Sequence, residues 1–202
     1  MIISVKTSVR SYDVVLEKGS LNRLDELLNL NRKVLIVTDD GVPETYSKTV
    51  MEQCKEPFIV TLPQGESTKS IDNYLYLLKV MVENSFTRSD CVLAVGGGVM
   101  GDLAGFAAST FMRGIDFYNV PTTVLSQVDS SIGGKVAVDF SGYKNIVGAF
   151  YPPKRVVIDV DTLKTLPQRQ ISNGLCESVK MAMTFDKDLF GMFEKGDFDI
   201  ET

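Results

Sequence analysis

A run of glycines at residues 96–101 (GGGVMG) is the first pattern in the chain that could serve a ligand. It follows the apolar run 91–95 (CVLAV), which is typical of a buried strand, and we expect it to open a helix. Glycines let a backbone approach a pyrophosphate closely, and a helix N-terminus favours its negative charge. The run formally matches GxGxxG, although a tight turn without a ligand would look the same. The run also departs from the usual Rossmann pattern, because it follows a late strand of the chain and not the first.

Residues 121–139 (PTTVLSQVDSSIGGKVAVD) form the most unusual stretch of the chain. It is rich in small hydroxyl residues and holds one acid–base pair, Asp129 and Lys135. Such a mixture packs poorly in a core and suits a cradle for a polar ligand, although a surface loop is the alternative. Lys144 and Asn145 follow in what we expect to be a second polar loop, and Arg113 follows the helix expected after the glycines.

Two further polar positions lie where strands or loops meet helices. Asp39 and Asp40 follow the apolar run 33–38 (KVLIVT), and an acid at the end of a strand can bind ribose hydroxyls. A solvated turn is an equal alternative. Glu66 and Lys69 lie in a loop before an expected helix, where they could clamp polar ligand groups or simply form an N-terminal charge pattern.

Glu177 and Lys180 are spaced to share one face of a helix. They interrupt an apolar stretch (LCESVKMAM), so we expect both to be partly buried. A buried carboxylate needs a cation or a metal, and a simple salt bridge is the competing interpretation. The 202 residues include no histidine, so this chain alone cannot complete a Ser-His-Asp triad or a multi-histidine metal site.

The elements that must position these residues alternate along the chain. Apolar runs predict strands at 33–38, 58–62, 91–95, 117–120 and 155–160, with a strand pair in 2–16. Helical spacing at 71–82, with Ser70 or Thr68 as a cap, separates two of them. This order predicts an α/β fold, with a Rossmann-like parallel sheet and flanking helices over 1–165. Residues 166–202 read as helix and are expected to begin an α-helical second domain.

Composition narrows the class of protein. Apolar residues make up 44% and charged residues 23%, as in a soluble globular protein. The net charge of −5 argues against nucleic acid as a partner, and no apolar run approaches the roughly 20 residues of a membrane helix. Three widely spaced cysteines do not suggest a disulfide framework. We therefore expect reduced thiols and a cytoplasmic location.

Taken together, the motifs resemble 3-dehydroquinate synthase over nearly the whole chain. They are LPQGESTKS at 62–70, GGGVMGDLAGFAASTFMRG at 96–114, PTTVLSQVDSSIGGKVAVD at 121–139, YKNIVGAFYPP at 143–153 and TLPQRQISNGLCESVK at 165–180. Related metal-dependent alcohol and glycerol dehydrogenases share the glycine triplet and the Pro-Thr-Thr turn. They lack the long QVDSSIGGK block, which separates the two interpretations.

The resemblance implies binding of NAD and assigns residues to it. Asp39 would hold the NAD ribose, with Asp102 close to the nicotinamide side. Further cofactor contacts would come from Glu66, Lys69, the pyrophosphate loop Gly97, Gly98 and Val99, and from Thr122, Thr123 and Leu125.

It also implies a substrate and metal site. Residues facing the substrate or the nicotinamide would be Asp129, Lys135, Lys144 and Asn145. Arg113 would reach the substrate phosphate, in some members across a homodimer. Glu177 would be a ligand of a divalent metal, zinc or cobalt, and Lys180 a substrate-binding lysine. The family completes its metal site with histidines from its second half, which this chain lacks.

The implied reaction converts a sugar phosphate, 3-deoxy-D-arabino-heptulosonate 7-phosphate, to 3-dehydroquinate plus phosphate in the shikimate pathway. It proceeds by transient oxidation through NAD, elimination of phosphate, re-reduction and an intramolecular aldol closure. We expect the 202-residue chain alone to be inactive. A related sugar-phosphate cyclase and a noncatalytic NAD-binding module remain as alternatives.

Overall fold

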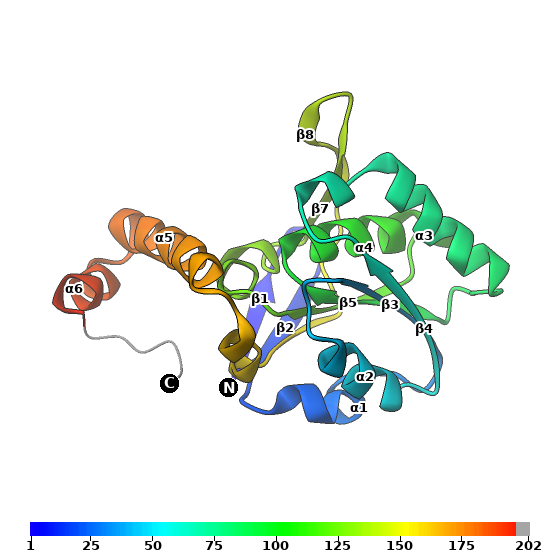
Figure 1. Ribbon diagram of the computed structural model, residues 1–202, viewed down its shortest axis with the longest axis horizontal. Helices are drawn as coiled ribbons and strands as arrows, with labels where there is room; N and C mark the ends of the chain where they lie inside the picture. Colours follow the sequence, from blue (N-terminus) through cyan, green and yellow to red (C-terminus); the bar gives the residue numbers. More distant parts are fainter. Residues whose placement is uncertain (197–202) are drawn as a thin grey trace.

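The computed structural model describes residues 1–196 and contains one large sheet (Figure 1). Its strand order is β1-β2-β9-β6-β5-β3-β4. The strands are β1 (Ile2–Lys6), β2 (Ser11–Leu16), β3 (Lys33–Asp39), β4 (Glu56–Leu62), β5 (Cys91–Gly96), β6 (Asp116–Pro121) and β9 (Arg155–Ile158). Apart from the antiparallel pair β1–β2, neighbouring strands run parallel. The predicted α/β class with a mostly parallel sheet is confirmed.

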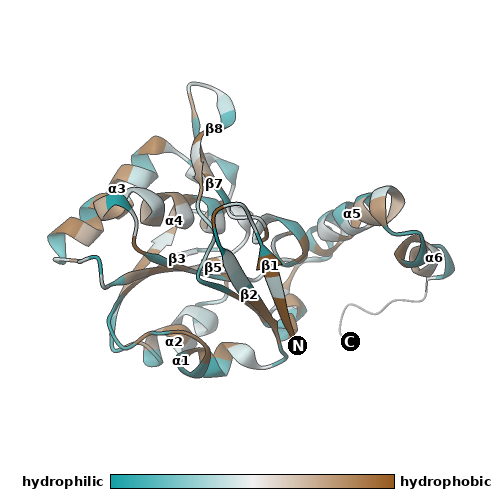
Figure 2. Cartoon of the chain, turned by 180° about the vertical axis from the view of Figure 1, so that it is seen from behind, coloured by the Kyte–Doolittle hydropathy of each residue, from teal (hydrophilic) through white to brown (hydrophobic). Residues whose placement is uncertain are grey.

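Helices cover both faces of this sheet, which explains why its central strands are continuously apolar. In Figure 1, α1 (Leu24–Leu27) and α2 (Glu44–Glu52) lie on one face, and α3 (Ile71–Glu83) and α4 (Gly98–Thr110) on the other. Two separate apolar cores fill these two layers. Every residue of β5 is buried. Figure 2, which is coloured by hydropathy, shows brown, hydrophobic stretches along the strands of the sheet.

The order of the strands creates a crevice beside β3. Strand β4, which follows β3 in the chain, pairs with one side of β3, and the next strand, β5, pairs with the other side. The connections that leave β3 and β5 therefore diverge to opposite faces of the sheet. In open α/β sheets, ligands bind in the crevice outside the carboxyl ends of strands at such a point.

Short helical segments form several of the strand-end connections. They are η1 (Ser20–Arg23), η2 (Glu66–Thr68), η3 (Phe111–Arg113), the π-helical η4 (Ser126–Ser130) and η5 (Val160–Thr165). The cap of α3 is Ser70, whose hydroxyl accepts a hydrogen bond from the Asn73 backbone at 3.3 Å. The strand expected to run to residue 160 ends at Ile158, and η5 takes over two residues later.

A β-hairpin, β7 (Lys135–Phe140) and β8 (Tyr143–Phe150), projects beyond the sheet. The expectation that Lys144 and Asn145 lie in a polar loop is wrong, because both belong to β8. Ser141 and Gly142 form the turn with positive φ angles of 50° and 81°, as in a two-residue type I′ turn. Strand β8 is largely exposed, so it lacks the apolar alternation that would reveal a half-buried strand.

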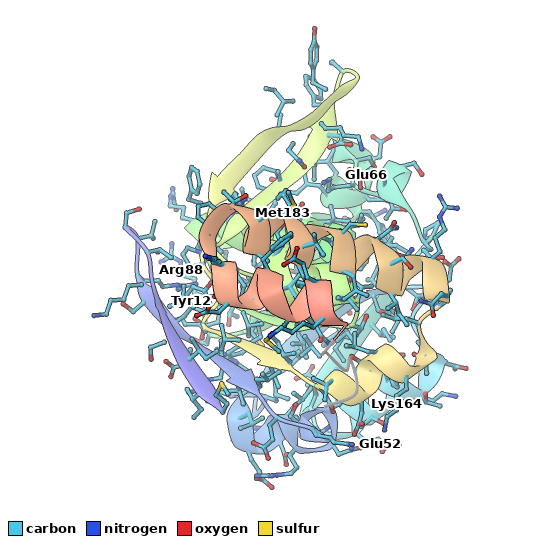
Figure 3. The ribbon with its side chains drawn as sticks, turned by 90° about the vertical axis from the view of Figure 1, so that its left-hand side faces the viewer. Tyr12, Glu52, Glu66, Arg88, Lys164 and Met183 are labelled. Atoms are coloured by element: carbon cyan, nitrogen blue, oxygen red, sulfur yellow. The ribbon has the colours of Figure 1, made fainter. Side chains whose placement is uncertain are left out.

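The helices α5 (Gln168–Phe185) and α6 (Lys187–Lys195) project from the α/β body, as Figures 1 and 2 show. Residues 168–185 and 187–195 are thus helical, with Asp186 extended between them, and 197–202 lie outside the described residues. Apolar side chains of α5 are exposed, with Met183 (labelled in Figure 3) at 69% and Phe185 at 86%. Among residues 1–196, no helix is both long and apolar enough to cross a membrane.

Candidate functional site

A cleft of about 530 Å³ lies at the carboxyl ends of the parallel strands, in the crevice beside β3. Its walls come from the segments that follow β3, β4, β5, β6 and β9. The lining includes Asp39, Glu66, Lys69, Gly97, Gly98, Val99, Asp102, Thr122, Thr123 and Leu125. These residues come from four separate stretches of sequence, and the fold brings them around one space of a size typical for small-molecule sites.

Several lining residues were not singled out from the sequence. Thr162 and Thr165 follow β9 and could have been found by the strand-end rule that pointed to Asp39. Tyr46 lies on α2, and its hydroxyl is 3.1 Å from that of Thr165, so the two close one side of the cleft. Nothing in the local sequence marks Tyr46, because its position depends on how α2 packs.

Asp39 lies at the end of β3 and is only 8% exposed. Its Oδ1 accepts a hydrogen bond from the Gly41 backbone at 2.9 Å, which orients the carboxylate. Burial raises the pKa of Asp39, and the N–H groups of Gly41 and Val42 oppose that rise. A Cβ placed on Gly96 would lie 3.6 Å from Asp39 Oδ2, so the carboxylate faces the glycine turn after the neighbouring strand.

The glycine turn leads directly into α4. The backbone N–H groups of Met100 and Gly101 turn back to the Gly97 carbonyl at 3.1 and 3.2 Å. The N–H groups before them have no partner within the helix, and the first turn of α4 contains no acidic residue. This helix end therefore presents free donors and a partial positive charge to the cleft, which suits an anion.

A chain of ion pairs runs from the cleft to the hairpin. Lys69 Nζ lies 3.2 Å from Asp102 Oδ2 and 3.3 Å from Glu66 Oε1, and Lys144 Nζ lies 3.4 Å from the same Glu66 oxygen. Burial raises the pKa of Asp102 to about 6, although Lys69 acts in the opposite direction. Burial alone would lower the pKa of Lys69, but Asp102 and Glu66 together raise it. Lys69 therefore stays charged.

A second cavity of about 480 Å³ adjoins the cleft on the side of the hairpin. Asp129, Lys135 and Asn145 line it, and Asp102 and Ser130 line both spaces. Backbone contacts fasten the hairpin here, because the Asp139 N–H donates to the Lys69 carbonyl at 2.8 Å. The two cavities thus meet at a shared acid and a shared hydroxyl.

Glu177 and Lys180 lie on α5 and form an ion pair with each other. The Glu177 side chain is 19% exposed, whereas that of Lys180 is 68% exposed, so the expectation that both are partly buried is wrong for Lys180. The long lysine side chain keeps its ammonium in water. α5 packs closely on the segment after β6 because Gly174 has no side chain where Val124 approaches.

The described residues do not form a complete metal site. Within 1–196, no group of three or more His, Cys, Asp or Glu side chains is arranged to hold a metal ion. Glu177 is one candidate ligand, and one carboxylate does not fit the usual tetrahedral zinc site.

Arg113 lies apart from the other predicted site residues. It follows the C-terminal end of α4, and a helix of 13 residues places it about 20 Å from the glycine turn. Its side chain is exposed and lines neither cavity. The structure therefore brings together the predicted residues of the cleft and of the second cavity, whereas Arg113, Lys144, Glu177 and Lys180 line neither space.

The sheet, its crevice and the cleft place the chain among α/β proteins with a ligand cleft at the carboxyl ends of a mostly parallel sheet. Residues 59–173 match the family model for the N-terminal part of 3-dehydroquinate synthase. The 3-dehydroquinate synthase of Idiomarina loihiensis is 42% identical over 197 residues, which cover 96% of this chain and 55% of that protein. The chain belongs to the 3-dehydroquinate synthase family, and it spans about half the length of the curated relatives it matches.

Solved structures of related cyclases have the same fold. A 2-epi-5-epi-valiolone synthase from Streptomyces hygroscopicus subsp. jinggangensis, with NAD+ and Zn2+ bound, superposes with a TM-score of 0.85. It is 32% identical, and the match covers 96% of this chain and 55% of that one. A 2-deoxy-scyllo-inosose synthase complexed with carbaglucose-6-phosphate, NAD+ and Co2+ gives a TM-score of 0.83 at 29% identity, covering 89% and 51%.

Proposed function

We propose that this chain is the NAD-binding part of a 3-dehydroquinate synthase. The whole enzyme would convert 3-deoxy-D-arabino-heptulosonate 7-phosphate to 3-dehydroquinate and phosphate. The observation that carries the proposal is the junction of the two cavities at Asp102. One cavity has the features of a dinucleotide site, and the other is lined by Asp129, Lys135 and Asn145, whose polar side chains suit a phosphorylated substrate.

The residues of the cleft fit NAD. Asp39 offers a preoriented carboxylate for ribose hydroxyls, and the free N–H groups at the start of α4 suit a pyrophosphate. Glu66 and Lys69, with Thr122, Thr123 and Leu125, would complete the contacts. Bound NAD would supply a reversible acceptor for hydride.

The second cavity would orient the substrate beside the cofactor. Lys135 and Asn145 would hold its anionic and hydroxyl groups, and Asp129 would accept a hydrogen bond from a substrate hydroxyl. Lys144, which is paired with Glu66, would hold that carboxylate in place beside the cofactor. Lys180 would extend toward the substrate from α5. These cations would draw in an anionic substrate despite the net charge of −5.

Glu177 would bind a divalent metal, zinc or cobalt, with further ligands from outside residues 1–196. Arg113 is exposed and lines neither cavity of its own chain, which supports its use in the site of a second copy of the chain. The enzyme would then be a homodimer that acts in the cytoplasm.

NAD titration by calorimetry tests the cofactor part of the proposal. The wild-type protein should bind one NAD per chain. An absence of binding at millimolar NAD would contradict the assignment of the cleft.

A related sugar-phosphate cyclase is the second candidate, because the valiolone synthase superposes so closely. The two candidates differ in substrate and share the cofactor. Assays of the full gene product with heptulosonate 7-phosphate and with a heptulose 7-phosphate that lacks the carboxylate would separate them. We expect turnover of the carboxylate-bearing substrate only.

A further inference from the structure

The hydroxyl of Ser130 is a buried donor without a partner. Its Oγ is shielded from solvent and makes no hydrogen bond to any of residues 1–196. Leaving such a group unpaired costs about 1–3 kcal/mol, so a buried orphan in a native protein calls for an explanation. Neither the cofactor contacts nor the substrate contacts proposed above include it.

The position of Ser130 points to a ligand. It is the last residue of the π-helical η4 and lines both the cleft and the second cavity. A Cβ placed on Gly98 would lie 2.7 Å from Ser130 Oγ, so the hydroxyl is packed against the first turn of α4. That turn carries free N–H donors for an anion.

The place of Ser130 in the cleft indicates which half of the dinucleotide it would contact. Asp39, the predicted ribose contact, belongs to β3, whereas Ser130 and Asp102 lie where the cleft opens into the substrate cavity. The dinucleotide must therefore present its nicotinamide half to Ser130.

We propose that Ser130 donates a hydrogen bond to the phosphate of NAD on the nicotinamide side, completing the anion site at the start of α4. This rests on the proposed function, since it takes the cleft to be the NAD site. Bound phosphate gives the orphan hydroxyl a partner, and a hydrogen bond to a charged group is worth more than a neutral one.

Calorimetric titrations of the full gene product with AMP, ADP, ADP-ribose and NAD test this assignment. Ser130→Ala should weaken ADP, ADP-ribose and NAD by about tenfold, which corresponds to one charged hydrogen bond, and leave AMP within about twofold. Without nucleotide, the variant should melt at the same temperature as the wild type or higher, because it loses an unpaired polar group.

Ser131→Ala is the matched control. Ser131 Oγ is also buried without a hydrogen bond to the described residues, but Ser131 lines neither cavity. This variant should bind all four nucleotides like the wild type.

Three outcomes of the Ser130→Ala titrations would overturn the proposal. Equal NAD affinity in wild type and Ser130→Ala would show that Ser130 makes no hydrogen bond to the bound cofactor. Equal weakening of AMP, with a lower melting temperature, would reveal a merely structural role. Loss confined to ADP-ribose and NAD would assign the hydroxyl to the ribose instead of the phosphate. Failure of the wild type to bind NAD would overturn this inference together with the proposed function, whereas the other results leave the latter standing.

Discussion

Lys69 Nζ lies 3.2 Å from Asp102 Oδ2, and this pair links the segment after β4 to the helix after β5 in the lining of the cleft. Lys69 is only 5% exposed, and Asp102 has a pKa raised by burial. The two charges thus hold each other in place beside the space proposed for NAD.

Removing the lysine should destabilise the fold. Lys69→Met leaves Asp102 buried without its cation, and breaking a largely buried pair from one side costs about 3 kcal/mol. Urea unfolding followed by circular dichroism measures this loss. Lys79→Met is the control, because Lys79 pairs with Glu83 on the surface with side chains 68% and 60% exposed. Its effect should stay within about 0.5 kcal/mol, and equal effects of both substitutions would contradict the role given to Lys69.

The raised pKa of Asp102 makes stability depend on pH. The folded protein retains the Asp102 proton up to about pH 6, whereas the unfolded chain loses it near the ordinary aspartate pKa of 3.8. This carboxyl therefore contributes stability at low pH that is lost as pH rises between these values. Asp102→Asn lacks this dependence. The unfolding free energy of the variant minus that of the wild type should rise by on the order of 2 kcal/mol from pH 4 to pH 7. A difference that stays flat with pH would show an unshifted Asp102.

Asp39 should contribute directly to NAD affinity. Asp39→Asn keeps an oxygen for the Gly41 N–H but removes the charge offered to ribose hydroxyls, so NAD should bind about tenfold more weakly. Calorimetry measures the change. Asp25→Asn, which removes an exposed acid on α1, should leave NAD affinity unchanged. Indistinguishable affinities for Asp39→Asn and wild type would place the ribose elsewhere.

The 202-residue chain should bind NAD without turning over the sugar phosphate. It contains no histidine, and Glu177 alone does not form a metal site. An assay of the purified chain with NAD, divalent metal and heptulosonate 7-phosphate checks this. Appearance of 3-dehydroquinate without any other polypeptide would show that these residues suffice.

The sheet could be predicted from sequence because its strands are buried on both faces. The apolar runs 33–38 and 91–95 correspond to β3 and β5 with bounds that differ by one residue. Strand β8 could not be predicted in this way, since most of its side chains face solvent and its residues pair only with β7. The polar pair Lys144 and Asn145 therefore looks like a loop in the sequence although it lies in this strand.

The candidate site was predictable where a residue type follows a strand or a glycine turn, as for Asp39 and Gly98. Tyr46 carries no local sequence signal, because its role depends on how α2 packs beside the cleft. Ser130 belongs to the predicted polar cradle 121–139, but nothing in the sequence singles it out from the other hydroxyl residues there. The exposure of Lys180 also escaped prediction, since apolar neighbours in sequence do not bury a long side chain whose ammonium can reach water.

Product stoichiometry of the full gene product tests the central claim most directly. With heptulosonate 7-phosphate, divalent metal and NAD far below substrate, 3-dehydroquinate and phosphate should form in equal amounts over many turnovers, with no accumulation of NADH. Accumulation of NADH in step with product would indicate a dehydrogenase. An absence of 3-dehydroquinate under these conditions would contradict the account.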